Sequence, residues 1–494
     1  MSDETNEGEG PATPSRQLKH ADWNPWYVLM TLYGADSHYN RKVWNAWAGQ
    51  ALTEEEKKKL SVTPGDPLNE VGEWSEYKSE VETFFANETK RRAGKELRIP
   101  DPLQRVDLSG LLFDQILDLM GLVFPRAVSF SGSDLRFGLW ANNAYFCKHA
   151  SWSRASVEIQ CIFDGAIFES QAVFETTNFV CDVEFDQVKF CSSAIFSNSK
   201  FGAKSSFSLA NFEREAVFSG CVFSGVASFR AVNFLGAADF PTVTFESRAD
   251  FGEAQFLSDA ISKRFGRRTS VSTPVRFVST DFKGSTDFSN ARFSFCYPDF
   301  SGAVLHEKTS FTKDSFEKSF WPGQGVEDVE NAQKTCGAIR HVLSKQGLPE
   351  EAHFFFRREM YFAEAVTKSQ SGSFWQRLPY LLYRGLSDYG HSIARPALWL
   401  AGLWAFGFVA FWGFFAGCCV PAPLAEVTRP MGAAMGLSFS NLFPLFGFGR
   451  VFFGAEFMAS LPPVLKLLAG FQTVASLPLL FFLGLGLRQR FRLR

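Results

Sequence analysis

The sequence predicts an all-β solenoid with helical caps, followed by an α-helical membrane domain that crosses a bilayer twice. Three observations predict this fold class. Eighteen phenylalanines recur in one unbroken series, at alternating steps of five and six residues. The segments on either side of that series have helical periodicity. Two uncharged 21-residue segments, 397–417 and 467–487, lie near the C-terminus.

The phenylalanine series excludes two simpler folds. On a helix, steps of five and six residues would place the rings on two stripes about 140° apart. In one long strand, the odd steps would send alternate rings to opposite faces. A chain that turns a corner every five or six residues and stacks its coils points every ring inward. This predicted core ladder consists of Phe163, Phe168, Phe174, Phe179, Phe185, Phe190, Phe196, Phe201, Phe207, Phe212, Phe218, Phe223, Phe229, Phe234, Phe240, Phe245, Phe251 and Phe256.

The same spacing extends beyond the series in both directions. Upstream, apolar residues such as Phe146 and Val157 keep the period, and downstream it resumes at Phe277 and continues, one residue out of register, to Phe316. We therefore expect a solenoid over residues 104–320, with about nine coils and a length of roughly 40 Å. A basic loop interrupts it at 261–274, either as a solvated excursion or as a docking point for an acidic or phosphate group. Its basic residues are Lys263, Arg264, Arg267 and Arg268.

The repeat unit resembles that of the pentapeptide-repeat family. A small residue stands two positions before the central ring, as in Ala216-Val217-Phe218 and Ala249-Asp250-Phe251. The resemblance implies a right-handed quadrilateral β-helix with four faces per coil. This chain differs from the family pattern by a sixth residue on alternate faces. We therefore expect 22 residues per coil and corners that bulge.

The flanking segments are predicted to be caps. Residues 1–20 have the composition of a disordered tail. Residues 21–103 form a mostly helical cap or a separate recognition module, in which Thr53 and Glu56 make a capping box. Residues 324–394 form a helical hairpin that closes the solenoid, followed by an interfacial segment. The aromatic-basic-acidic run at 354–360 resembles the segment after the repeats in bacterial membrane-anchored pentapeptide-repeat proteins.

The membrane domain is predicted over residues 395–494. The spans 397–417 and 467–487 are each long enough for one crossing. Arg488, Arg490, Arg492 and Arg494 favour a cytoplasmic C-terminus. The polar, acidic N-terminus lacks a secretory signal pattern, so both termini and the solenoid are expected on the cytoplasmic side of a bacterial inner membrane. The apolar segment 431–449 contains Pro444 and is expected to be re-entrant or interfacial.

A channel is the main alternative for this domain. Two spans around a re-entrant helix resemble simple two-span cation channels, and the solenoid would then be a regulatory domain of an oligomer. A potassium filter would fall on 443–449, which keeps two of its glycines and nothing else. Gln472, Thr473 and Ser476 form a short polar stripe in the second span. They either line a pore or make intramembrane contacts between helices.

The sequence contains no candidate catalytic, cofactor-binding or metal-binding residues. Phosphate-loop and nucleophile-elbow motifs do not occur, and the closest histidines, His341 and His353, match no metal-ligand spacing. Nine cysteines without a Cys-x-x-Cys pair indicate reduced thiols. The net charge of −2 gives no bias towards nucleic acid.

The predicted function is therefore a non-enzymatic, membrane-anchored scaffold that presents the solenoid to a protein. The expected partners are membrane lipid and an unidentified protein. Self-association of the chain stays open, and nucleic acid is not expected. The weaker alternative is a DNA mimic that modulates topoisomerases. Acidic residues outnumber basic ones 12 to 6 between Phe163 and Phe256, which is a mild excess for such a mimic.

Overall fold

The computed structural model describes residues 18–62, 71–256, 275–293, 297–316, 326–370, 373–417 and 430–491. The basic loop at 261–274 and residues 1–17 of the predicted tail lie outside the described residues. The chain divides into two compact units, Met1–Trp321 and Pro322–Arg494. Each unit is described by itself.

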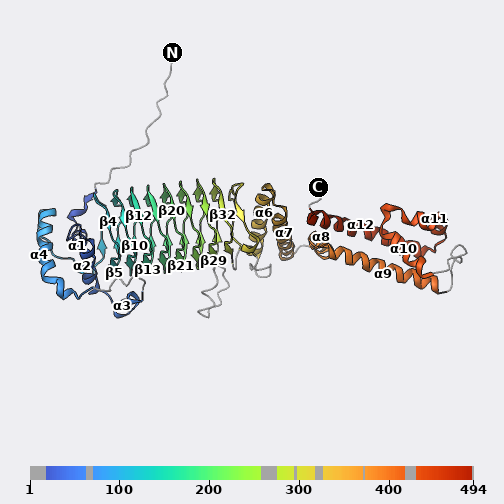
Figure 1. The fold of residues 1–494 in the computed structure, drawn as a ribbon, viewed down its shortest axis with the longest axis horizontal. Helices are drawn as coiled ribbons and strands as arrows, with labels where there is room; N and C mark the ends of the chain where they lie inside the picture. Colours follow the sequence, from blue (N-terminus) through green and yellow to red (C-terminus); the bar gives the residue numbers. More distant parts are fainter. Residues whose placement is uncertain are drawn as a thin grey trace, which may run out of the picture. The chain divides into compact units, whose positions relative to one another are not determined.

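The first unit is a parallel β-solenoid (Figure 1). Its short strands form four sheets. Neighbouring strands of a sheet are four places apart along the chain, except that β1 pairs with β3 and β34 pairs with β32. Ala172 is in register with Ala194, and Ala194 with Ala216, so one coil takes 22 residues. The predicted fold class is confirmed: a parallel solenoid, preceded and followed in the chain by helices, with two apolar helices long enough to span a membrane.

The four sheets, named A to D here, have nine, eight, nine and eight strands. Sheet A contains β1 (Lys19–His20), β3 (Leu111–Leu112), β7 (Asp134–Leu135), β11 (Ser156–Val157), β15 (Asn178–Phe179), β19 (Lys200–Phe201), β23 (Val222–Phe223), β27 (Thr244–Phe245) and β31 (Asp281–Phe282). Sheet B contains β2 (Val106–Asp107), β6 (Val128–Ser129), β10 (Ala150–Ser151), β14 (Ala172–Val173), β18 (Ala194–Ile195), β22 (Ala216–Val217), β26 (Ala238–Asp239) and β30 (Val275–Arg276). Sheet C contains β4 (Leu117–Asp118), β8 (Leu139–Trp140), β12 (Gln160–Ile162), β16 (Asp182–Glu184), β20 (Ser205–Ser206), β24 (Ala227–Ser228), β28 (Ala249–Asp250), β32 (Thr286–Phe288) and β34 (Ser310–Phe311). Sheet D contains β5 (Val123–Phe124), β9 (Tyr145–Phe146), β13 (Ile167–Phe168), β17 (Lys189–Phe190), β21 (Asn211–Phe212), β25 (Asn233–Phe234), β29 (Gln255–Phe256) and β33 (Arg292–Phe293).

The corners of each coil are of two kinds. Within every five-residue step of the phenylalanine series, the second residue after the first ring has a positive φ; Gln187, Leu209 and Gly220 are examples. This left-handed conformation closes a tight corner. No residue of the six-residue steps between Phe163 and Phe256 has a positive φ. The longer step therefore turns its corner without the left-handed conformation.

Helices cover the N-terminal end of the solenoid (Figure 1). They are η1 (Ala21–Trp23), α1 (Pro25–Met30), α2 (Ser37–Gly49), α3 (Glu54–Ser61) and α4 (Trp74–Ala93). Trp44 Nε1 of α2 donates to the Val123 carbonyl at 2.9 Å, and Asn45 bonds Gly121 and Val123 at 3.0 Å. These side chains give hydrogen-bond partners to the N–H and C=O groups of Val123, at the open edge of sheet D. Residues 19 and 20, which the sequence places in the tail, form β1 and cover the edge of sheet A.

The second unit is helical. Its helices are α6 (Val326–Lys345), α7 (Pro349–Ser369), α8 (Phe374–Ser387), α9 (Ala394–Ala416), α10 (Pro430–Leu442), η4 (Pro444–Phe446), α11 (Phe448–Ser460) and α12 (Pro463–Phe491). α6 packs against α7, and α9, α10 and α12 pack against one another. That the hairpin of α6 and α7 closes the solenoid stays a prediction.

The apolar segment 431–449 does not form one continuous helix, and its re-entrant or interfacial placement stays a prediction. α10 ends at Leu442, because Pro444 has no N–H to donate and Gly447 takes a left-handed φ of 62°. A second short helix, α11, then runs to Ser460 and is kinked at Gly454. The sequence pattern does not predict α11.

Candidate functional site

The phenylalanines of the predicted ladder fill the interior of the solenoid. All eighteen are at most 1% exposed. Phe196 stacks on Phe218 at 4.8 Å between ring centroids, with 1° between the planes, and Phe218 stacks on Phe240 in the same way. Phe207 meets Phe218 edge to face at 5.5 Å, so rings also contact across the coil. The ladder is the core, and any partner of the solenoid must contact its outer surface.

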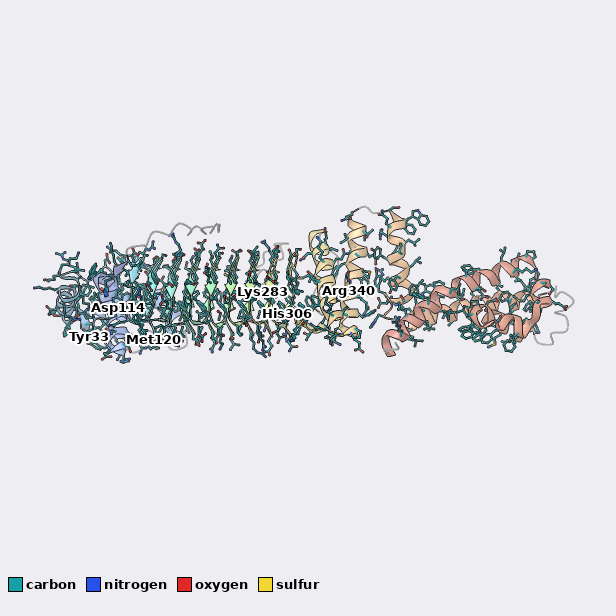
Figure 2. The ribbon with its side chains drawn as sticks, turned by 90° about the horizontal axis from the view of Figure 1, so that it is seen from above. Tyr33, Asp114, Met120, Lys283, His306 and Arg340 are labelled. Carbon is teal, nitrogen blue, oxygen red and sulfur yellow. The ribbon has the colours of Figure 1, made fainter. Side chains whose placement is uncertain are left out.

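The outer surface carries polar side chains such as Lys283 and His306 (Figure 2). On two neighbouring coils, Glu184 ends strand β16, and Asp164 and Asp186 follow strands β12 and β16. The Asp186 amide donates to Asp164 Oδ1 at 3.1 Å. Burial, with the charges of Asp186 and Glu184 adding to it, raises the pKa of Asp164 to about 6. Within the described ranges, no three His, Cys, Asp or Glu side chains are grouped so that they could hold a metal ion.

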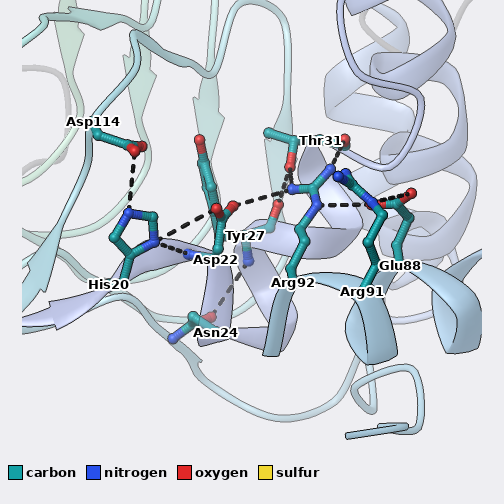
Figure 3. A network of polar contacts seen from close by, with 9 residues as sticks. All are labelled: His20, Asp22, Asn24, Tyr27, Thr31, Glu88, Arg91, Arg92 and Asp114. Carbon is teal, nitrogen blue, oxygen red and sulfur yellow. Dashed lines mark hydrogen bonds and ion pairs between the residues drawn. The ribbon is translucent and has the colours of Figure 1, made fainter. Parts of the chain in front are cut away.

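A polar network joins the N-terminal helices to the first coils (Figure 3). His20 and Asp114 form a contact of 3.1 Å between Nε2 and Oδ2. The Arg92 guanidinium donates to Thr31 Oγ1 at 2.8 Å, to the Thr31 carbonyl at 2.9 Å and to Glu88 at 2.9 Å. Hydrogen bonds from Arg91 and then Arg92 hold the pKa of Glu88 below its ordinary value. The network fastens α4 to α1, so it is structural.

A buried cluster of polar side chains makes hydrogen bonds between α9, α10 and α12. Gln472 is fully buried and donates from Nε2 to the Leu403 carbonyl and to Ser438 Oγ, both at 2.9 Å. Its Oε1 accepts from Asn441 Nδ2 at 3.1 Å. Ser438 Oγ donates in turn to the Trp404 carbonyl at 2.7 Å. Gln472 therefore connects three helices through its amide group.

Gly407 leaves the space that this cluster needs. A Cβ at residue 407 would overlap the Gln472 amide and lie 2.6 Å from Ser438 Oγ. Small residues that let helices approach closely, together with polar contacts across them, are typical of helix packing inside membranes.

The other two predicted polar residues of the second span face their own helix. Thr473 Oγ1 donates to the Ala469 carbonyl and Ser476 Oγ to the Thr473 carbonyl, both at 2.9 Å. Gln472 is thus the member of the predicted stripe that bonds neighbouring helices. The sequence pattern did not predict Ser438 and Asn441 as hydrogen-bond partners of Gln472. Both residues belong to a short polar run, 438–441, in an otherwise apolar segment.

A second network surrounds the turn between α8 and α9, where Asp388, Tyr389 and Gly390 all have positive φ. Asp388 accepts from Arg357 at 2.5 Å and from Tyr361 at 2.9 Å. Glu364 accepts from Arg384 at 3.0 Å and from the buried Tyr389 hydroxyl at 3.0 Å. Burial, followed by the hydrogen bond to Asp388, raises the pKa of Tyr361. These bonds connect α7 to the start of the first candidate span.

The described cysteines are free thiols, and most are buried. Burial raises the pKa of Cys181 to about 11 and that of Cys221 to about 12. Because the thiolate is the reactive form, these side chains are poor nucleophiles. They pack as small apolar residues.

Comparison with known proteins identifies one family. Residues 207–255 match the family model of pentapeptide repeats in nine copies. This stretch begins directly after β20 and contains β21 to β28 and the first residue of β29. No curated protein and no solved structure matches the chain.

Proposed function

We propose that the protein is a membrane-anchored scaffold, held in the bilayer by α9 and α12, whose solenoid binds a protein partner. The observation that carries the proposal is the surface of the two helices. Residues Ala394–Ala416 and Pro463–Arg488 are long and apolar enough to cross a membrane, and only 22% of the most apolar stretch of each is buried. Trp399, Val409, Leu467 and Val474 are 56%, 59%, 75% and 69% exposed. Lipid is the solvent that such side chains need.

The proposed topology has two crossings and a cytoplasmic solenoid. Arg488 ends the second apolar stretch and three further arginines follow it, so the C-terminus resists translocation. Two crossings then place residues 1–393 on the same side, and residues 420–429 on the other. We assign the membrane to a bacterial inner membrane on the resemblance of the C-terminal segments.

The solenoid supports a binding role better than an enzymatic one. Its phenylalanines are in ring contact both along and across the coil, so the interior is a packed core. Rigid stacked coils offer an extended outer surface, which is how repeat proteins contact partners.

The polar cluster at Gln472 supports packing over conduction. A pore needs polar groups that face water. The Gln472 amide instead donates to the Leu403 carbonyl of α9 and accepts from Asn441 of α10. Thr473 and Ser476 donate to carbonyls of their own helix. These bonds favour the scaffold over the channel.

Compartment-sensitive reporter fusions test the topology. Fusions after Glu426, after Glu456 and at Arg494 are expected to report outside, outside and inside. A cytoplasmic signal after Glu456 would mean that α10 and α11 complete a third crossing. Purified protein in planar bilayers is expected to pass no ion current. Unitary conductance that is lost in Gln472→Leu would replace the scaffold with the channel.

A further inference from the structure

The outer row of sheet D changes from apolar to polar along the solenoid. In each two-residue strand of this sheet the second residue is the inward aromatic, so the first residue faces outward. The first three outward residues are Val123, Tyr145 and Ile167. The next five are polar or charged: Lys189, Asn211, Asn233, Gln255 and Arg292.

The short helix α3 covers the apolar part of this row. Leu60 is fully buried in one cluster with Leu52, Val123, Tyr145 and Cys147, and Ile167 packs against that cluster. The helix therefore lies where the outward row is apolar, and the polar row starts one coil further on.

Two ion pairs orient α3 on this face. Lys59 Nζ lies 3.1 Å from Glu169 Oε2, and the other oxygen of Glu169 accepts from the Tyr145 hydroxyl at 2.7 Å. Lys148 Nζ lies 2.7 Å from Glu56 Oε1. The solenoid thus presents a base and an acid on either side of an apolar patch, and α3 presents the complementary charges.

Few buried contacts attach α3 to the solenoid. Leu60 is the only buried side chain of the helix, and Glu54, Glu55 and Lys58 are exposed. The lysines of the two ion pairs are 60% and 49% exposed, so water and salt screen both pairs. An eight-residue helix has little stability without its packing. Elements with few buried contacts open most readily.

We propose that the face formed by Val123, Tyr145, Cys147 and Ile167 is a docking surface for an amphipathic helix of a protein partner, and that α3 occupies it until displaced. The charges define the occupant: a helix with a leucine anchor, a lysine directly before it and a glutamate four residues before it. This inference rests on the proposed scaffold function and locates the surface to which the partner binds.

Thiol labelling of the full-length protein in detergent tests whether α3 is displaceable. Cys147 lies under α3 and is 5% exposed, whereas Cys221 lies in the core and reports global unfolding. In Leu60→Asp, maleimide labelling of Cys147 is expected to accelerate at least tenfold, with Cys221 unchanged. Lys58→Ala, which changes an exposed side chain of the same helix, is expected to leave both rates unchanged. Unchanged Cys147 labelling in Leu60→Asp would overturn the proposal. So would faster Cys221 labelling in both Leu60→Asp and the milder Leu60→Ala, because α3 would then be part of the core fold.

A second experiment tests docking itself. The probe is a fluorescent peptide of residues 53–62, with a hydrocarbon staple joining the exposed positions 54 and 58. It is expected to bind full-length Leu60→Asp at least tenfold more tightly than the wild type and to protect Cys147 from labelling. A peptide that itself carries Leu60→Asp is the control and is expected not to bind. Equal binding to both proteins, or no binding to either, would contradict the proposal. The membrane topology does not enter this result, so its failure is distinguishable from that of the anchor.

Discussion

The solenoid and the C-terminal helices distribute apolar and polar groups in opposite ways. In the solenoid, stacked rings fill the interior and polar side chains cover the outside. Among α9, α10 and α12, the fully buried Gln472 joins the three helices, while large apolar side chains such as Leu467 and Val474 point outward. Water drives rings inward, but lipid is as apolar as leucine and gives helices no such drive. The proposed membrane anchor requires this contrast, because it places the solenoid in water and the C-terminal helices in lipid.

The largest effect is expected from removing one ring of the ladder. Phe218 stacks between Phe196 and Phe240, and Phe218→Ala would leave a cavity that the rigid coils cannot close. The expected cost is about 3–5 kcal/mol of unfolding free energy. Glu213→Ala, on the outer surface, is expected to cost under about 0.5 kcal/mol. Denaturant titration of the two variants compares them, and the reverse ranking would break the distinction between inside and outside.

A smaller loss is expected from the polar cluster. Gln472→Leu leaves the amide of Asn441 without its acceptor in a buried position. The expected cost is about 1–2 kcal/mol, because a buried donor that has lost its acceptor keeps its desolvation penalty. Thr473→Val is the matched control, because that hydroxyl bonds its own helix. Thermal unfolding in detergent micelles is the measurement. Equal losses from both variants would mean that the cluster does not connect the helices.

The corners of the coils offer a gain instead of a loss. Leu209 is 57% exposed and has a φ of 61°, a conformation that favours glycine. Leu209→Gly is expected to stabilise the solenoid by about 0.5–1 kcal/mol, since the relief of strain exceeds the added chain entropy. Val226→Gly, at an exposed position without a positive φ, is expected to destabilise. A loss in Leu209→Gly would show that the two kinds of corner do not differ in strain.

The smallest effect concerns Asp164. Its raised pKa means that the folded chain holds more protons than the unfolded chain between the ordinary value of 3.8 and about 6. Stability therefore falls as the pH rises through this window. Asp164→Asn, which keeps the acceptor for the Asp186 amide, is expected to stabilise at pH 7.5 by at most about 1 kcal/mol, because this carboxyl is partly solvated. The gain should vanish below about pH 4. A gain that does not depend on pH would assign it to another cause.

The sequence predicts the two regions unequally well. The phenylalanine spacing predicts the solenoid because every coil places the same kind of side chain in the core at the same position. β1 has two residues and no apolar pattern, so the sequence does not predict it. It forms because β3 leaves an open edge of sheet A with which it can pair. Gly110, Gly132 and Gly220 are separated by whole multiples of the 22-residue coil and all take the left-handed conformation. These glycines could have predicted the left-handed corners, which the spacing of the apolar residues does not predict.

The helical unit lacks such a period. Apolar length identifies α9 and α12, but α11 interrupts its apolar run with Arg450 and Glu456 and escaped prediction. Gln472 was visible as a polar residue in an apolar span. Its contacts to Ser438 and Asn441 depend on how α9, α10 and α12 pack, which no local pattern specifies.

The most direct test of a solenoid in water and helices in lipid is labelling in intact cells. Single cysteines introduced by Ser208→Cys in the solenoid and by Glu426→Cys between the spans are treated with a membrane-impermeant maleimide. We expect Glu426→Cys to gain label in intact cells and Ser208→Cys to gain label only after permeabilisation. Label on Ser208→Cys in intact cells, or release of the whole protein by alkaline carbonate, would contradict the proposed topology.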